Sequence, residues 1–278
     1  MGRIGTISSG DVSFSNCDFI SCNNNQNSPR ENGGAISYLV SNGNLTVTLC
    51  YFYRCIAYSM QGGAIDARYA NDVIISSSTF VHCEAYAATT YSGGGAVDLW
   101  YINKQLSISL CSFVSCFSKD DGGAAAIWSS SATDNQIVCQ ECRFINGAAT
   151  GSSNACGGGI ILWDNSNVLK CTNILFALNT ASYGGAYATN NIYVAPHYIL
   201  SFCFFNRNTG TYGNDIYFLS WPSYSPFLYC FSTSESDRIG YYSSEYQTTD
   251  ADWFPQTSIT IKLTRSRTPM PQSTHTEQ

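Results

Sequence analysis

The sequence predicts an all-β protein, a right-handed parallel β-helix of about seven coils. Three observations lead to this prediction. A glycine-rich motif recurs along the chain, a phenylalanine motif recurs in step with it, and short segments of alternating polar and apolar residues lie between the two. No long segment has the periodicity of an amphipathic helix. Each repeat is therefore expected to form one coil of a solenoid.

The glycine motif consists of two glycines, a small residue and usually an apolar residue. Its steps are 29, 32, 28, 35, 27 and 29 residues, with a mean of 30. A period in this range is typical of repeat proteins, in which each unit packs against its neighbours. Glycine suits a corner before a strand because it adopts positive φ and permits close backbone approach. The copies begin at Gly33, Gly62, Gly94, Gly122, Gly157, Gly184 and, in decayed form, Gly213.

The phenylalanine motif reads Cys-x-Phe-x-x-Cys in its fullest form, as at residues 17–22, 50–55 and 111–116. Its Phe-to-Phe steps of 33, 28, 33, 31, 32 and 29 residues match the glycine period. Before each Phe, apolar residues alternate with Ser or Thr, as in residues 45–49, and such alternation is typical of strands. Alternation also follows each glycine pair, and a third short strand fits the stretch after Phe.

The composition argues against nucleic acid and anionic lipid as main partners. Only 12% of the residues are charged, the net charge is −6 and the isoelectric point is about 4.9. Nucleic acid and anionic lipid attract clustered Lys and Arg, so neither is an expected partner. No window of 18 or more apolar residues exists, so no transmembrane helix is expected, and no apolar signal-peptide core stands at the start of this sequence.

The 13 cysteines mostly belong to the repeat. One set stands two residues before Phe and a second set three residues after it, so the sets should form two columns along the solenoid. They are interpreted as small buried core residues, with disulfides as the alternative if the protein is secreted. Only Cys139 and Cys142 have zinc-finger spacing, and no second pair matches them, so no metal or cofactor is expected.

Taken together, the Gly-Gly-Ala-Ile and Phe-x-x-Asn motifs resemble the repeats of the polymorphic outer membrane protein family. The resemblance covers roughly residues 11–218, and Cys-rich versions of such repeats occur in large protozoan surface families. It implies a pectate-lyase-like solenoid with a surface or adhesive role and no known catalysis. The chain departs from the family by placing cysteine where Asn is frequent, at Cys22, Cys55, Cys83 and Cys116.

One column of residues is the candidate binding site. The sixth residue after the first glycine of each repeat should point outward by strand parity, and three tryptophans fall there in consecutive repeats. Asp66 and Asp98, two positions earlier in their strands, should also face outward in adjacent coils. The column contains Leu39, Arg68, Trp100, Trp128, Trp163 and Asn190.

Two interpretations of this column stay open. A flat aromatic stripe could stack on sugar rings or anchor a protein, with Arg68 over Trp100 as a cation–π contact. Alternatively, the rings stabilise the solenoid or are covered by loops. Asp66 and Asp98 could also serve, with Arg68, as a carboxylate pair or a Ca²⁺ site, and many β-helix proteins are polysaccharide lyases or hydrolases.

The sequence thus predicts a β-helix over residues 1–220, a C-terminal cap over 221–263 and a disordered tail over 264–278. The expected function is a non-enzymatic surface or secreted protein that binds glycans or host or surface proteins through its side wall. The alternatives are a carbohydrate-active enzyme and a purely structural spacer from a larger surface protein. A cell-surface or extracellular location is expected from the resemblance.

Overall fold

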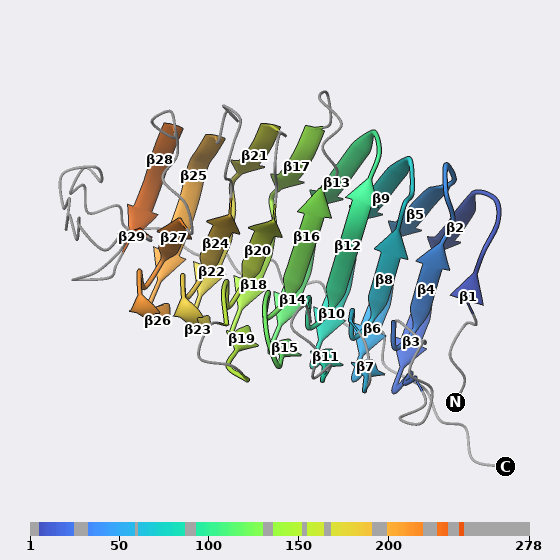
Figure 1. Cartoon of the computed structure of the whole chain (residues 1–278), viewed down its shortest axis with the longest axis horizontal. Helices are drawn as coiled ribbons and strands as arrows, with labels where there is room; N and C mark the ends of the chain where they lie inside the picture. The colour runs from blue at the N-terminus through green and yellow to red at the C-terminus, as the bar shows by residue number, and fades with distance from the viewer. Residues whose placement is uncertain are drawn as a thin grey trace, which may run out of the picture.

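The structure is a computed structural model, and every regular element that it describes is a β-strand paired in parallel with its neighbours (Figure 1). The strands of the described residues assemble into three long sheets, called A, B and C here, which run along the solenoid. The described residues are 6–24, 33–58, 61–86, 93–129, 136–151, 155–163, 168–190, 199–218, 227–232 and 239–241.

Sheet A is built from the segments that follow each glycine pair. Its nine strands, in spatial order, are β1 (Thr6–Ile7), β4 (Ile36–Leu39), β8 (Ile65–Arg68), β12 (Val97–Ile102), β16 (Ala125–Ser129), β20 (Ile160–Trp163), β24 (Tyr187–Asn190), β27 (Ile216–Phe218) and β29 (Ile239–Tyr241).

Sheet B has two rows of strands joined through one long strand. The first row holds the alternating segments before Phe: β2 (Val12–Ser15), β5 (Asn44–Thr48), β9 (Asp72–Ser76), β13 (Gln105–Ser109), β17 (Gln136–Gln140) and β21 (Val168–Thr172). The second row carries the Phe residues: β3 (Asp18–Ile20), β6 (Tyr51–Tyr53), β10 (Thr79–Val81), β14 (Ser112–Val114), β18 (Arg143–Ile145) and β22 (Leu175–Ala177). The joining strand is β25 (Ile199–Asn206), which also pairs with β28 (Phe227–Ser232).

Sheet C consists of short strands that follow the second row. They are β7 (Ile56–Ala57), β11 (Glu84–Ala85), β15 (Phe117–Ser118), β19 (Ala148–Ala149), β23 (Thr180–Tyr183) and β26 (Thr209–Tyr212).

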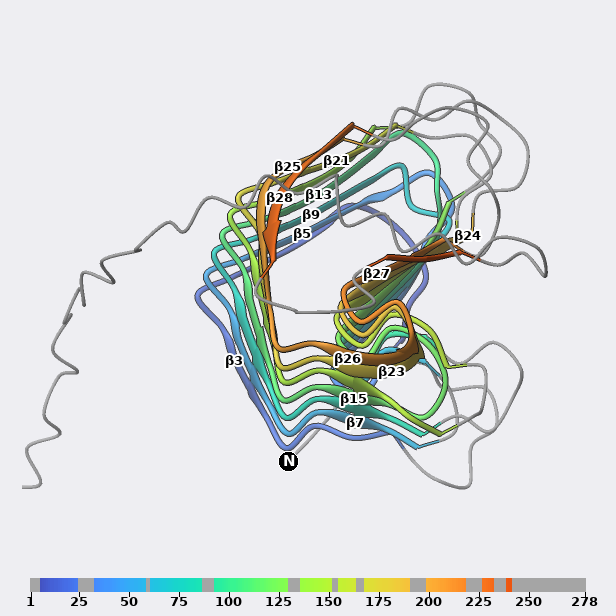
Figure 2. The same cartoon turned by 90° about the vertical axis from the view of Figure 1, so that its left-hand side faces the viewer.

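The chain therefore forms a parallel β-solenoid, as the repeats predict, and viewed along its length the coils superimpose (Figure 2). Five consecutive turns, from β4 to β23, carry the same four strands each. The expected number of about seven coils is reached only if the less regular turns at both ends are included. The right-handed sense of the coil stays a prediction.

The seven Phe residues of the repeat form a single stack through the core. Each is buried, and successive ring centroids lie 4.6 to 5.1 Å apart with nearly parallel planes. The register pairs Phe with Phe in every coil, because each repeat places its ring at the same point of the second row of sheet B. The stack comprises Phe19, Phe52, Phe80, Phe113, Phe144, Phe176 and Phe205.

The two glycines of the motif have different tasks. The first adopts positive φ in every copy, as at Gly122 (φ 58°), and turns the chain into sheet A. The second has no such φ, but it lies directly against the backbone of sheet C. At Gly123, an added Cβ would stand 2.1 Å from the Gly158 carbonyl oxygen and 2.5 Å from the Ala148 nitrogen. Only glycine permits this approach between sheets A and C.

The structure explains how cysteine replaces Asn three residues after Phe. Asn179 donates from Nδ2 to the carbonyl oxygen of Phe144 in the preceding coil, at 2.9 Å. In earlier coils the cysteine thiol donates to the equivalent Phe carbonyl, as from Cys55 to Phe19 at 3.4 Å. The thiol therefore satisfies the same buried acceptor while filling less space. The prediction that the cysteines lie in the core is confirmed for 12 of the 13, which are buried.

The corners before the second row of sheet B hold non-glycine residues with positive φ, and the chain uses Asn at two of them. Leu110 occupies such a corner with φ 55° and a 56% exposed side chain. Asn tolerates this conformation better than Leu, and little apolar burial is lost. We expect Leu110→Asn to raise the free energy of unfolding by about 0.5–1 kcal/mol, measured by urea denaturation. The same change at Ile20, an exposed strand residue without positive φ, should not stabilise.

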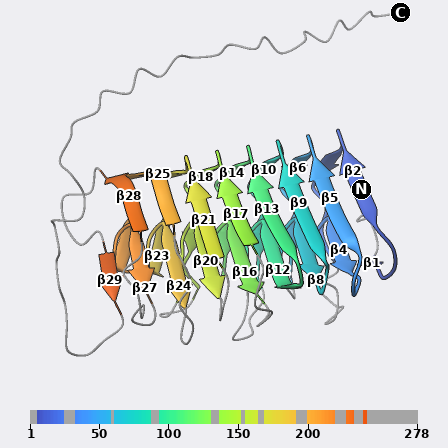
Figure 3. The same ribbon diagram turned by 90° about the horizontal axis from the view of Figure 1, so that it is seen from above.

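Beyond residue 220, β28 and β29 continue sheets B and A, and Figure 3 shows them at the end of the stack. The rest of the expected cap over 221–263, and the expected tail over 264–278, lie outside the described residues. Within the described ranges, no helix has the length and apolar character needed to cross a membrane.

Candidate functional site

The expected column forms as predicted on sheet A. Arg68 in β8 pairs in register with Trp100 in β12, which pairs with Trp128 in β16, and Trp128 pairs with Trp163 in β20. The column ends toward the chain termini at Leu39 and Asn190, which are the register partners of Arg68 and Trp163. All three tryptophans are partly buried.

The tryptophan rings stack on one another, so the column is not the flat stripe expected from sequence. Trp100 and Trp128 have centroids 4.5 Å apart with planes at 22°, and Trp128 and Trp163 have centroids 4.9 Å apart with planes at 9°. The Arg68 guanidinium covers the remaining face of Trp100, with Cζ 5.1 Å from the ring centroid. Since faces meet faces along the solenoid, the rings present mainly their edges to the surroundings.

Two exposed tyrosines adjoin this column, and sequence reasoning missed them. Tyr69 and Tyr101 follow Arg68 and Trp100 directly, and their side chains are 48% and 39% exposed. Their rings stack with centroids 5.8 Å apart, and Tyr101 also meets Trp100 edge to face at 5.9 Å. We call the set of Arg68, Tyr69, Trp100, Tyr101, Trp128 and Trp163 the side-wall patch. The signal was available, because both tyrosines follow the column by one residue.

The expectation that Asp66 and Asp98 are presented on the outside is wrong. They pair in register, and their side chains point away from the core side of sheet A, but both residues are 0% exposed. Arg68 bonds to Asp66, and Gly93, the residue before the glycine pair, lies against Asp98. An added Cβ at Gly93 would stand 2.6 Å from Asp98 Oδ1 and 2.6 Å from the Ala126 Cβ. Strand parity predicts the direction of a side chain but not what covers it.

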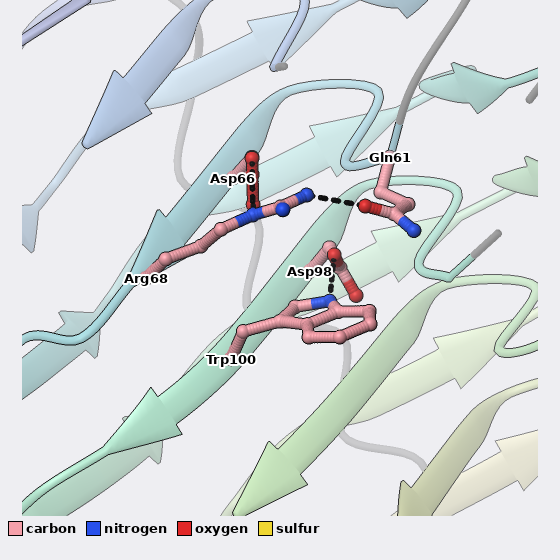
Figure 4. A network of polar contacts seen from close by, with 5 residues as sticks. All are labelled: Gln61, Asp66, Arg68, Asp98 and Trp100. Carbon is pink, nitrogen blue, oxygen red and sulfur yellow. Dashed lines mark hydrogen bonds and ion pairs between the residues drawn. The ribbon is translucent and has the colours of Figure 1, made fainter. Parts of the chain in front are cut away.

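Arg68 is held by a polar network (Figure 4). Its Nε donates to Asp66 Oδ1 at 2.9 Å and Oδ2 at 3.1 Å, and its terminal nitrogen donates to Gln61 Oε1. Gln61 precedes the glycine pair of its own coil and was not predicted as a site residue. Burial alone would lower the pKa of Arg68, but the carboxylates of Asp66 and Asp98 raise it, so the side chain stays charged.

Asp98 has a different environment from its neighbour. The Trp100 indole N–H donates to its Oδ2, while its Oδ1 is buried without a hydrogen-bond partner. Burial, and then the charge of Asp66, raise the pKa of Asp98 well above its usual value, against the opposing effects of Arg68 and Trp100. The register pair therefore consists of one carboxylate bound to Arg68 and one acid whose pKa is raised.

A second apolar cluster covers the outer face of sheet A in later coils. It contains Ala126, Cys156, Ile161, Ala188 and Tyr217, with Trp163 and Tyr183 packed against it. Asp121 borders this cluster in the same position as Gln61, and its Oδ1 accepts from the Cys156 backbone N–H at 2.9 Å. Burial, followed by the charge of Asp120, raises the pKa of Asp121 to about 8. Sheet A is therefore buried on both faces over much of its length.

Asp121 should make stability depend on pH. Its folded pKa of about 8 exceeds the usual 3.8, so its contribution is fully present below pH 3.8 and is lost as pH rises through 8. The free energy of unfolding of the parent protein should fall by about 4–6 kcal/mol between pH 4 and pH 9 because of Asp121. In the Asp121→Asn variant this fall should be absent. Urea denaturation across this range, for the parent and the variant, measures the difference.

The matched control is Asp120→Asn, which removes a neighbouring charge but leaves the buried acid in place. This variant should keep most of the pH dependence. A parent protein and an Asp121→Asn variant with the same slope would contradict the assignment.

Among the described residues, no group of three or more His, Cys, Asp or Glu side chains is placed to hold a metal ion. Arg68 is hydrogen-bonded to the carboxylate of Asp66, and Gly93 lies against Asp98. The two carboxyl groups therefore do not form a pair that solvent can reach. Comparison of the chain with protein-family models, with curated proteins and with solved structures gave no match. The resemblance to polymorphic outer membrane protein repeats stays a prediction from the motifs.

Proposed function

We propose that the protein is a non-enzymatic adhesion module, at a cell surface or secreted, that binds a protein partner through the side-wall patch. The observation that carries the proposal is the in-register column of Arg68 and three tryptophans, bordered by two exposed tyrosines. Trp, Tyr and Arg are the residue types most enriched at the energetic centres of protein interfaces.

The stacking geometry favours a protein over a glycan. Sugars bind aromatic side chains through ring faces, and in this column both faces of Trp100 and of Trp128 are occupied by neighbouring rings or by Arg68. Ring edges and tyrosine hydroxyl groups remain available, and these suit the mixed apolar and polar contacts of a protein partner.

The alternative of a carbohydrate-active enzyme receives no support from the carboxyl pair. A polysaccharide must reach its catalytic groups from solvent, and Asp66 and Asp98 are both 0% exposed. An experiment distinguishes the spacer alternative from the binding proposal, because a purely structural spacer would bind no ligand through the side-wall patch.

The test compares the intact chain with two double variants. The patch variant carries Tyr69→Ser and Tyr101→Ser, and the control variant carries Tyr86→Ser and Tyr212→Ser. The control tyrosines are also exposed but belong to the sheet C side of the coil. Each protein is coated on beads and measured against purified extracellular-matrix proteins and a glycan array. We expect binding to a matrix protein that weakens at least tenfold in the patch variant and is unchanged in the control.

Absence of binding by the intact chain, or equal binding by both double variants, contradicts the proposal. Binding confined to the glycan array would assign the patch to carbohydrate instead. Circular dichroism of the two variants shows whether the fold is retained in both.

A further inference from the structure

The cysteines two residues before Phe occur as isolated neighbouring pairs along their column. The strand register places successive members beside one another, and Ser78 and Ile174 interrupt the column between pairs. If these positions required only a small core residue, every coil would have the same requirement. That requirement would therefore not explain why the cysteines occur in pairs. The pairs are Cys17 with Cys50, Cys111 with Cys142, and Cys203 with Cys230.

The remaining cysteines of the repeat also have neighbours in register. Cys139 in β17 pairs with Cys171 in β21, and the next residue in that column is Leu200. The column three residues after Phe holds four consecutive cysteines: Cys22, Cys55, Cys83 and Cys116. Four members in a row allow two adjacent pairs.

Cys156 is the single exception. Its neighbours are Asp121, which accepts a hydrogen bond from its backbone, and Tyr183, its bridge partner in the next coil. Twelve of the 13 cysteines thus fall into six pairs of adjacent coils, and one is left over.

The spacing and direction of the thiols are suitable for bridging. Parallel strands lie about 4.8 Å apart, so register neighbours have Cα atoms inside the range of roughly 4.4–6.8 Å that disulfides span. The thiols point along the solenoid toward the preceding coil. Cys142 Sγ donates to the Ile108 carbonyl at 3.5 Å, and Cys50 Sγ to the Phe14 carbonyl at 3.6 Å, in the coils that hold Cys111 and Cys17.

We propose that under oxidising conditions six disulfides join adjacent coils, at Cys17–Cys50, Cys22–Cys55, Cys83–Cys116, Cys111–Cys142, Cys139–Cys171 and Cys203–Cys230, with Cys156 left as a thiol. Each closes one coil, with partners 27 to 33 residues apart. Oxidised glutathione is a sufficient oxidant. Two protein thiols give up two electrons and two protons through a mixed disulfide, one S–S bond forms in the protein, and two glutathione thiols leave.

Other pairings leave cysteines without a partner. A Cys55–Cys83 bridge would leave Cys22 and Cys116 without disulfide partners, because these two lie three rungs, or about 14 Å, apart. A bridge between Cys139 and Cys142 would strand Cys111 and Cys171 in the same way. The proposed set is the one that pairs every column completely.

Oxidation should accompany folding rather than follow it. Burial raises the pKa of Cys22 to about 11 and also raises the pKa of Cys50, whereas a hydrogen bond with Cys83 lowers the pKa of Cys55, and all three thiols are buried. Thiol–disulfide exchange needs the thiolate and access to it. The bridges therefore form while coils stack on one another.

The full chain is reduced and unfolded, and then refolded either with a mixture of oxidised and reduced glutathione or with a reducing agent. Each product is denatured, labelled with N-ethylmaleimide and analysed by intact mass and peptide mapping. We expect one label, on Cys156, after oxidative refolding and 13 after reductive refolding. Mapping should recover the six proposed pairs.

Matched variants separate the proposal from general oxidation. Cys156→Ser should abolish the single label, whereas Cys111→Ser should add a second label on Cys142. Oxidation in concentrated urea, where no register exists, should give scrambled pairs. Complete labelling after oxidative refolding, or a mapped set dominated by other pairs such as Cys139–Cys142, overturns the proposal, and the wild-type map decides even if a variant fails to fold.

Discussion

Replacing Gly123 with Ala should prevent the protein from folding. The added Cβ would lie 2.1 Å from the Gly158 carbonyl oxygen and 2.5 Å from the Ala148 nitrogen, and contacts under 3.0 Å do not occur. Both atoms belong to the backbone, one in the glycine pair of the next coil and one in β19 of sheet C, so no flexible side chain can move aside. Relief requires sheets A and C to separate, which would expose core on both sides. We expect a loss of more than about 4 kcal/mol in unfolding free energy, a large part of a typical domain's stability.

Gly10→Ala is the control for this prediction. Unlike Gly123, Gly10 has positive φ, at 79°, but nothing lies within 4 Å of an added Cβ. It should therefore lose only about 1–2 kcal/mol, the cost of the backbone conformation. Urea denaturation followed by circular dichroism measures both variants. A Gly123→Ala protein with the parent's midpoint would show that sheets A and C are not packed as described.

The second large effect concerns the two buried acids of the polar network, which should respond to the same substitution in opposite ways. Asp66→Asn removes the carboxylate that receives two hydrogen bonds from Arg68 and leaves a largely buried cation without its charge partner. Breaking a buried ion pair from one side is costly, and because the Arg68 side chain is 17% exposed we expect about 2–4 kcal/mol of destabilisation at pH 7.

Asp98→Asn should stabilise the protein at pH 7, and more so at higher pH. The neutral amide has nearly the shape of the neutral acid, and its oxygen can still accept from the Trp100 indole N–H. Since the pKa of Asp98 is raised, its contribution is present below the ordinary carboxyl pKa and is lost as pH rises through the folded value.

Asp18→Asn, at an exposed position on β3, serves as the control and should lie within about 0.5 kcal/mol of the parent. Thermal and urea denaturation at pH 7 and pH 9 compare the three variants. If Asp98→Asn were the more destabilising change, the charge on the pair would reside on Asp98 and the description of the network would be wrong.

The repeat pattern was sufficient to predict the solenoid, because each motif places a residue type with a specific packing requirement at a fixed interval along the chain. A stacked Phe must meet a Phe in the next coil, and a glycine pair must meet the backbone of sheet C, so the period dictates the register. The column of Arg68, Trp100, Trp128 and Trp163 followed from that register alone, and it is present. The same logic placed the cysteines in columns inside the core.

The surroundings of the outward side chains depended on contacts that the repeat does not encode. Gly93 lies against Asp98, and Gln61 accepts a hydrogen bond from the Arg68 side chain that binds Asp66. Both residues stand at the variable position before the glycine pair.

Periodicity along one strand therefore determined which side chains leave the core. Only tertiary structure decided that those tryptophans stack face to face, that Tyr69 and Tyr101 remain exposed, and that one acid binds Arg68 while burial raises the pKa of its neighbour. The physical reason is that register is set by local backbone pairing, whereas burial and charge are set by segments that return to the sheet from elsewhere in the coil.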